Sequence, residues 1–232
     1  MDLNIVTLFF FVLAVLVFIQ LRSVLGRRTG NERPPFDPYS NSLVSTGGTL
    51  PAHYDRVVND FSDIDAVFPF GTLLNSGLRD IKKADYTFSP VSFCNGARIA
   101  YEIIMVAFSK GDRVDLKKLL SEEVYKGFSK AIDEREAKEE SIEFSFVGVK
   151  MAEIISASMQ KNESYLSVRF CSDIISATYD KNKILIDGDP KSIIEVHDIW
   201  IFSRDAYASD PNWKLVATSV NEASSVQDAI VL

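Results

Sequence analysis

The first long apolar stretch of the chain covers residues 3–21 and contains no charged residue. Only Asn4, Thr7 and Gln20 are clearly polar in it. About 20 apolar residues in a helix span the hydrocarbon core of a bilayer, where backbone groups must be hydrogen-bonded internally. We therefore predict a transmembrane helix at residues 3–21. A cleaved signal peptide is the alternative, but no basic segment precedes the stretch and no small-residue cleavage site follows it.

Three arginines follow this stretch, at Arg22, Arg27 and Arg28. Positively charged residues next to a span stay on the inner side, so the short N-terminus is predicted outside and the domain inside. The expected location is the inner (cytoplasmic) membrane, with the domain on its cytoplasmic or matrix-equivalent side. The arginines flank the membrane anchor as topology determinants, which we favour, or as contacts to anionic lipid headgroups.

Residues 22–60 have the composition of a flexible juxtamembrane linker. Glycine, proline, serine and asparagine are frequent there, and apolar residues show no regular spacing. Such a segment buries too little apolar surface to offset the entropy lost on ordering. A passive spacer is the simpler interpretation, and a partner-binding segment around Phe36, Tyr39 or Tyr54 is the alternative. Residues 221–232 are predicted to form a disordered tail.

From residue 61 onward, apolar residues recur at helical spacing. A short helix is predicted over residues 70–81. A longer one starts after Ser89, a good N-cap followed by proline, and ends at Gly111, where a left-handed residue is favoured. Apolar residues cover much of its circumference, which predicts burial on more than one side. A third helix is predicted to begin after Ser121.

After Ser141 the apolar spacing changes from helical to alternating, which is typical of half-buried strands. Turn residues separate the alternating stretches, which lie at residues 142–146, 166–171, 194–202 and 213–218. Helices followed by strands predict an α+β fold rather than an α/β fold. We expect one domain at residues 61–220, with N-terminal helices packed on one face of a curved antiparallel sheet of about four strands.

The charge distribution narrows the possible partners. The chain of 232 residues has a formal net charge of −7. Residues 1–30 carry +2, from one aspartate against three arginines, so the remainder carries −9. A surface this acidic is poorly suited to phosphate backbones, and no nucleic-acid partner is expected.

Familiar catalytic and cofactor motifs are missing from the sequence. It contains no glycine-rich phosphate loop, nucleophile elbow or HExxH segment. Its two cysteines and two histidines are scattered singly, so neither a disulfide framework nor a zinc-type cluster is expected. We predict no cofactor and no enzymatic activity. His197 is the one plausible general acid or base, but a surface or partly buried position is the simpler interpretation.

Uncommon short motifs occur in a fixed order along the predicted domain. They lie in FSPVSFCNGARIAYEIIMVAFSKGD (88–112), LSVRFCSDIISATYD (166–180) and IDGDPKSIIEVHDIWIFSRDAYASDPNWKLVAT (186–218). Together these stretches resemble the C-terminal domain of the forty-four kDa subunit of the mitochondrial inner-membrane translocase (Tim), which anchors the import motor. The resemblance is closer to the bacterial, membrane-anchored, single-domain members of that family.

This resemblance covers residues 61–220 and implies a cone-shaped, nuclear-transport-factor-two-like α+β fold, with helices and a curved sheet around an apolar pocket. As partners it implies membrane lipids and either a translocase component or a heat-shock-seventy-class chaperone. The mitochondrial protein has a long N-terminal region that carries much of its channel and chaperone binding. In this chain the predicted span and linker take its place.

Six residues are candidates for a ligand or partner pocket in such a domain. They are Phe93, Ala97, Arg98, Tyr101, Trp200 and Arg204. For the aromatic residues and Arg204, ordinary structural packing is the alternative role, and we favour it. For Arg98 the alternative, which we also favour, is a salt bridge between helix and sheet. Cys94 and Cys171 lie in apolar segments and are expected to be buried small hydrophobes.

The function expected from these observations is that of a membrane-anchored, non-catalytic adaptor. It would place a pocketed α+β domain at the inner face of the inner membrane, in protein translocation or membrane protein handling. The alternative is a protein that binds a lipid or small molecule in the apolar pocket. An enzyme that uses this pocket is the less favoured form of this alternative.

Overall fold

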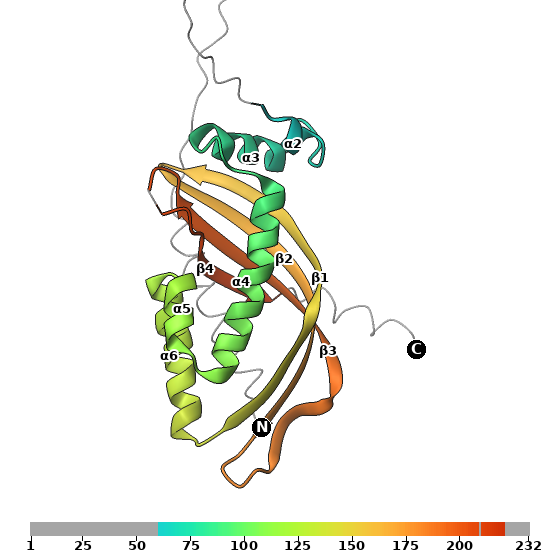
Figure 1. The fold of residues 1–232 in the computed structure, drawn as a ribbon, viewed down its shortest axis with the longest axis vertical. Helices are drawn as coiled ribbons and strands as arrows, with labels where there is room; N and C mark the ends of the chain where they lie inside the picture. Colours follow the sequence, from blue (N-terminus) through green and yellow to red (C-terminus); the bar gives the residue numbers. More distant parts are fainter. Residues whose placement is uncertain (1–59, 209, 221–232) are drawn as a thin grey trace, which may run out of the picture.

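The computed structural model describes residues 60–208 and 210–220, in which helices precede a sheet (Figure 1). The predicted span, its flanking arginines, the linker up to residue 59 and the C-terminal tail lie outside the described residues. The elements are α2 (Ser62–Asp65), α3 (Leu73–Ala84), α4 (Pro90–Lys110), α5 (Arg113–Leu119), α6 (Glu122–Ala137), β1 (Ser141–Gln160), β2 (Glu163–Tyr179), β3 (Leu185–Asp205) and β4 (Lys214–Val220). This order confirms the predicted α+β class.

The start and end signals of the long helix are confirmed. The Ser89 hydroxyl accepts a hydrogen bond of 3.4 Å from the Ser92 amide at the start of α4. Gly111 ends the helix in the left-handed conformation, with φ of 72°. Ser121 caps α6 in the same way as Ser89 caps α4, by accepting from the Val124 amide at 3.3 Å. These caps satisfy amides that have no partner within the helix.

The first predicted helix starts later than its apolar spacing indicated. α3 begins at Leu73, because Thr72 is its N-cap and accepts a hydrogen bond of 3.1 Å from the Asn75 amide. Leu73 is 92% exposed, whereas Leu78 and Ile81 are fully buried. The inward face of α3 therefore starts one turn further along the chain than the spacing suggested.

The sheet is an antiparallel meander in the order β1-β2-β3-β4. The first three strands are 20, 17 and 21 residues long, well beyond the alternating stretches visible in the sequence. The start of β3 is exposed on both faces, so it has no alternation to detect. Register shifts interrupt the β1–β2 pairing, and such bulges bend and twist long strands. The result is a curved sheet with helices on one face (Figure 1), as in a nuclear-transport-factor-two-like fold.

The core lies between helices α3 to α6 and the inner face of the sheet. The Tyr101 ring stacks on Phe170, with ring centres 4.4 Å apart, and lies 4.5 Å from the centre of Trp200. Gly77 brings α3 directly onto β1, because a Cβ at this position would lie 2.0 Å from the carbonyl oxygen of Ala157. Only glycine permits an approach this close.

Candidate functional site

An aromatic-lined pocket of about 320 Å³ lies beside the first half of α4. We call it the α4 pocket. Its other walls come from the end of β3 and the loop before β4. The lining residues are Asp85, Thr87, Phe88, Ser89, Ser92, Phe93, Gly96, Ala97, Ala100, Leu119, Phe202, Arg204, Pro211, Asn212 and Trp213. Its volume is at the low end of the range for small-molecule sites, and its lining is more apolar than polar.

Four aromatic rings belong to the apolar part of this lining. The Phe93 ring meets Trp213 and Phe202 edge-on, with ring centres 4.9 and 5.9 Å apart. Phe88 lies 6.2 Å from Trp213. Edge-to-face pairs hold one another in place beyond the contribution of buried area. The pocket therefore presents a rigid apolar wall suited to an acyl chain or a ring.

An ion pair between Asp85 and Arg204 forms the polar end of the pocket. Each of these side chains is only 12% exposed, and the Arg204 guanidinium lies 5.2 Å from the centre of the Trp213 ring. Burial alone would raise the pKa of Asp85, but hydrogen bonds from Thr87 and Arg204 outweigh it and hold that pKa below its ordinary value. Asp85 stays ionised, so the pair carries no net charge.

Three of the six predicted pocket residues, Phe93, Ala97 and Arg204, line the α4 pocket. Tyr101 and Trp200 instead lie in the core beneath it, 0% and 3% exposed. Core packing was the alternative role for these two aromatic residues.

Arg98 is half-buried on α4 and does not line the pocket. Among residues 60–208 and 210–220 no ion pair involves Arg98, so its alternative role as a helix-to-sheet salt bridge is not realised there. Arg204 makes the pair across the fold instead, with a partner 119 positions earlier in the sequence.

The pocket also contains residues that the sequence did not single out. Asp85 precedes α4 and meets Arg204 only because the chain folds back, so no local pattern marks it. Phe202 and Trp213 alternate with polar neighbours along predicted strands, and this alternation places them on the inner face without distinguishing pocket from core. The uncommon DPNW segment before β4 was the sequence feature that could have pointed to Trp213 as a pocket residue.

A buried polar cluster lies about one turn further along α4 than the pocket residue Ala97. The Tyr101 hydroxyl donates to Asp198 at 2.7 Å and lies 3.0 Å from the Ser172 hydroxyl. Burial raises the pKa of Asp198 to about 6, although the hydrogen bond from Tyr101 opposes this shift. Burial, followed by the nearby Asp198 charge, raises the pKa of Tyr101 far above its ordinary value. This tyrosine therefore remains protonated and is a structural hydrogen-bond donor.

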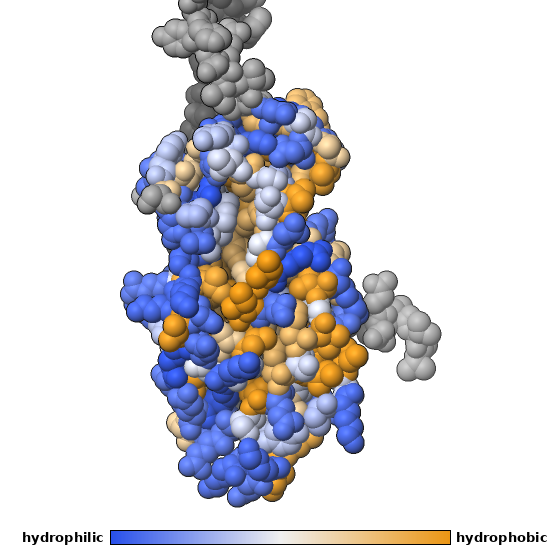
Figure 2. Space-filling view, viewed as in Figure 1, coloured by the Kyte–Doolittle hydropathy of each residue, from blue (hydrophilic) through white to orange (hydrophobic). Residues whose placement is uncertain are grey.

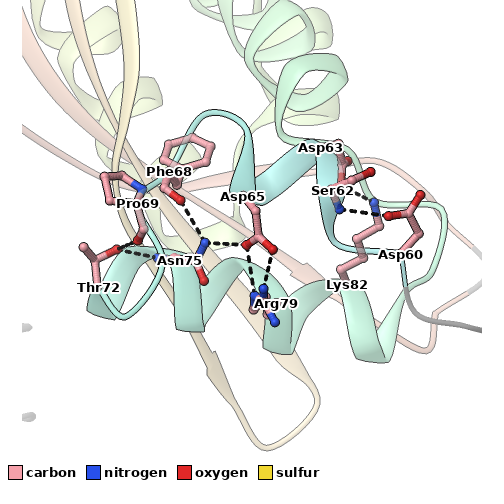
Figure 3. A network of polar contacts seen from close by, with 10 residues as sticks. All are labelled: Asp60, Ser62, Asp63, Asp65, Phe68, Pro69, Thr72, Asn75, Arg79 and Lys82. Carbon is pink, nitrogen blue, oxygen red and sulfur yellow. Dashed lines mark hydrogen bonds and ion pairs between the residues drawn. The ribbon is translucent and has the colours of Figure 1, made fainter.

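Polar contacts hold α2 against α3 at the end of the domain where the chain enters it (Figure 3). Asp65 pairs with Arg79, and Lys82 donates to Asp63 at 2.6 Å. The Asn75 side-chain amide donates to Asp65 and to the Phe68 carbonyl, both at 2.9 Å. These contacts fix a short helical hairpin that carries large exposed apolar side chains, namely Val67, Phe70 and Leu73.

The Tim44-like domain family matches residues 74–220, which is more than half of the chain. This chain belongs to that family. The Tim44-like domain therefore covers nearly the whole described structure, from α3 to β4. Membership supports a translocase-associated or membrane-associated role.

The individual proteins that are similar to this chain share little sequence identity with it. An uncharacterized protein of Rickettsia prowazekii (strain Madrid E) is 26% identical over 139 residues, which cover 60% of this chain and 56% of that protein. The chain thus matches only about half the length of this curated relative. Among solved structures, the intermembrane-space region of the chloroplast protein ARC6 is similar, with a TM-score of 0.39, 11% identity, and coverage of 55% of this chain and 95% of that one. A conserved protein from Planctomyces limnophilus has a TM-score of 0.32, 16% identity, and coverage of 53% and 90% respectively.

In the described part of the chain, one helix is long and apolar enough to cross a membrane, namely α4. Length and composition alone give this result, and the core helix of a soluble domain passes the same test. α4 packs Phe93, Ala97, Tyr101 and Ile104 into the core of the Tim44-like domain. A membrane-associated protein is consistent with this helix and with the family.

The surface of the Tim44-like domain that presents α4 and β1 also carries exposed apolar side chains. Figure 2 shows them gathered over the middle of the face that presents α4 and β1. Ile99 and Ile103 of α4 are 61% and 38% exposed, and Val147 and Met151 of β1 are 51% and 38% exposed. The prediction that this helix is buried on more than one side is therefore wrong, because its second apolar face, with Ile99 and Ile103, is exposed in the described structure.

One group of side chains in the described structure has the composition of a metal site. Cys171, Glu195 and His197 each offer one ligand atom, and these atoms lie within 4.8 Å of one another. The sequence predicted no such cluster, because these residues are far apart along the chain or separated by other residue types. The pairing of β2 with β3 brings them together.

Proposed function

We propose that this chain is a membrane-anchored, non-catalytic adaptor. It holds its Tim44-like domain at the inner face of an inner membrane, where the domain contacts lipid and either a translocase component or a heat-shock-seventy-class chaperone. Family membership supports the general role. The predicted span at residues 3–21 supports the anchoring, and the surface of the α2–α3 hairpin supports the contact.

The observation that carries the proposal is the exposure of apolar side chains where the linker joins the domain. Val67, Phe70 and Leu73 are 60%, 78% and 92% exposed. Burying each of them in a bilayer or against a partner would contribute about 1.5–3 kcal/mol. The Arg79 guanidinium, held by Asp65, lies 4.9 Å from the centre of the Phe70 ring and keeps that ring in place. The hairpin is thus organised before it meets its partner.

Site-specific photocrosslinking in intact membranes tests this role. A photoreactive residue at position 73 of the full chain is expected to crosslink to lipid and to a translocase component or chaperone. The matched control is position 193 on β3, where an isoleucine is 60% exposed but lies away from the hairpin. Equal crosslinking from both positions would contradict the proposal.

Two variants complete the test of the adaptor role. Deleting residues 1–25 should abolish the position-73 crosslinks, because the anchor confines the domain to the membrane surface and raises its effective concentration there. Phe70→Ser should weaken them while the domain stays folded, since this side chain is 78% exposed. A deletion variant that keeps both crosslinks and function would overturn the proposal.

The α4 pocket favours a second candidate function, the binding of a lipid or other apolar small molecule. Gly96 allows a direct test, because a Cβ added there meets no atom within 4 Å and the residue lines the pocket. Gly96→Leu should fill the pocket without displacing its walls. Mass spectrometry of ligands that co-purify with the full chain should show a stoichiometric lipid in the wild type and its loss in this variant.

The matched control for the pocket is Gly148→Leu on β1, where an added Cβ also meets no atom within 4 Å. This variant should retain the lipid. If Gly96→Leu loses the lipid but keeps the position-73 crosslinks, pocket binding and adaptor function are separate properties. If wild type and Gly96→Leu carry the same ligands, the pocket is not their binding site.

A further inference from the structure

The face of the sheet that points away from the helices carries a thiol and an imidazole side by side. Cys171 of β2 and His197 of β3 are direct partners in the antiparallel ladder. Their neighbours Ser172 and Asp198 point to the inner face, where both contact Tyr101. Because side chains alternate between faces along a strand, Cys171 and His197 share the outer face.

Glu195 adds an oxygen donor to this pair. It lies two residues before His197 and therefore on the same face of β3. Its carboxylate is 2.8 Å from the Nε2 atom of His197, and the Cys171 sulfur lies within 4.8 Å of the ligand atom that each of these two residues offers. One sulfur, one nitrogen and one carboxylate oxygen thus converge from two adjacent strands.

The spacing of these atoms is close to that of a metal-ligand set. Zinc binds thiolate, imidazole and carboxylate at about 2.0–2.3 Å, so its ligand atoms lie roughly 3–4 Å apart. The three donor atoms here already lie within 4.8 Å of one another. Small side-chain rotations close the difference, because all three side chains start from strands with a fixed register.

The charges around the cluster also favour a cation. Lys150 lies between Asp173 and Glu195, with its ammonium nitrogen 2.8 and 2.6 Å from their carboxylate oxygens. One ammonium group therefore faces two carboxylates. Asp173 is the ladder partner of Glu195 and lies beside the three donors, so it is a further oxygen donor once Lys150 moves aside.

We propose that Cys171, Glu195 and His197 form a binding site for a divalent transition metal of the zinc type, which links β2 to β3. On binding, the Cys171 thiol releases its proton to solvent and its sulfur bonds to the metal. The three protein ligands leave a fourth position for Asp173 or water. Cysteine and histidine together select zinc or cobalt over magnesium or calcium, which prefer oxygen ligands.

The burial of the site matches this chemistry. Cys171 is 7% exposed, whereas the His197 and Glu195 side chains are 28% and 47% exposed. The sulfur is thus shielded while the other two donors remain reachable, which gives the ion a path in.

Cobalt binding to the full chain, purified in detergent, tests the site. Titration with Co²⁺ alone should produce a thiolate-to-cobalt charge-transfer band and the strong visible bands of tetrahedral coordination, and zinc should abolish both. Cys171→Ser should remove the charge-transfer band. Cys94→Ser is the matched control, because Cys94 is the other free cysteine and lies on α4; it should leave the spectrum unchanged.

Variants of Glu195, His197 and Lys150 show whether a loss of metal binding in Cys171→Ser comes from the lost ligand or from misfolding. Glu195→Gln and His197→Ala should each weaken zinc binding by about tenfold or more, measured by competition with a chelator. Lys150→Met should strengthen it, because this change removes the competing ammonium and leaves every donor in place. A Co²⁺ spectrum without a charge-transfer band, or one that is identical in wild type and Cys171→Ser, would overturn the proposal.

Discussion

The Tyr101 hydroxyl donates a hydrogen bond of 2.7 Å to the carboxylate of Asp198, 97 positions further along the chain. It links the middle of α4 to β3 inside the core, where Tyr101 is 0% and Asp198 is 4% exposed. The same hydroxyl lies 3.0 Å from Ser172 on β2. One side chain thus fixes the helix to two strands.

Tyr101→Phe is expected to lower the free energy of unfolding by about 1–3 kcal/mol, because a buried polar group would lose its partner. Ring packing on Phe170 is kept, so the loss reports the hydrogen bonds. Urea denaturation followed by circular dichroism measures it. Tyr165→Phe is the control, since the Tyr165 hydroxyl bonds to Glu163 at a partly exposed position, and its effect should be much smaller. Equal losses in both variants would contradict this role for Tyr101.

Asp198 also predicts a dependence of stability on pH. Burial raises its pKa in the folded protein to about 6, above its ordinary value of 3.8. Between these two values the folded state binds the proton that the unfolded state has lost. The contribution of Asp198 to stability is therefore fully present below pH 3.8 and is lost as pH rises through 6, by up to about 3 kcal/mol.

Comparing the wild type with Asp198→Asn isolates this contribution, because other carboxylates titrate in both proteins. The difference in unfolding free energy should shift in favour of the asparagine variant as pH rises from 4 to 7. Several other carboxylates, Asp65 and Asp85 among them, have lowered pKa values and contribute in the opposite direction. A difference that stays constant over this range would show that Asp198 titrates normally in the folded protein.

The sequence predicts the architecture well because the main elements carry local signals. Ser89 and Gly111 mark the ends of α4 by capping chemistry that acts within a few residues. The inner parts of the strands alternate because one face is buried. The exposed start of β3 carries no such signal, and the start of α3 is set by the Thr72 cap rather than by apolar spacing, so neither bound could be read from the spacing.

The candidate sites are harder to predict, because they depend on contacts between distant parts of the chain. Phe93 and Ala97 lie on an apolar helix face that continues into the core, and nothing local divides its pocket end from Tyr101. Asp85 and Arg204 meet only through tertiary packing. Cys171 and His197 become neighbours through the register of two long strands, which irregularities shift by three residues and by one residue elsewhere in the same ladder.

Arg204→Met is expected to destabilise the domain by about 3 kcal/mol, the low end of the range for removing one partner of a buried ion pair. The remaining Asp85 carboxylate would stay buried without its counterion. Guanidinium denaturation measures the loss, and the double variant Asp85→Asn with Arg204→Met should recover part of it. Arg113→Met is the control, because Arg113 pairs with exposed acidic residues at the surface and should matter far less. A double variant no more stable than Arg204→Met would exclude an uncompensated charge as the cause.

Two helical glycines should respond in opposite directions to the same substitution. At Gly77 an added Cβ would lie 2.0 Å from the Ala157 carbonyl oxygen, and this backbone atom cannot rotate away. Gly77→Ala must push α3 off β1 and is expected to cost about 1–3 kcal/mol. At Gly96 an added Cβ meets no atom within 4 Å, so Gly96→Ala should stabilise α4 by about 0.5–1 kcal/mol.

The displacement of α3 has a functional consequence under the proposed role. α3 carries Leu73 at its start and, through Arg79, holds Phe70 in place, so moving the helix disturbs the exposed hairpin surface. Gly77→Ala should therefore reduce the position-73 crosslinks at temperatures where the domain is still folded, while Gly96→Ala leaves them unchanged. Thermal unfolding and crosslinking of both variants make the comparison. If Gly77→Ala is as stable as the wild type, the close packing of α3 on β1 is not what positions the hairpin.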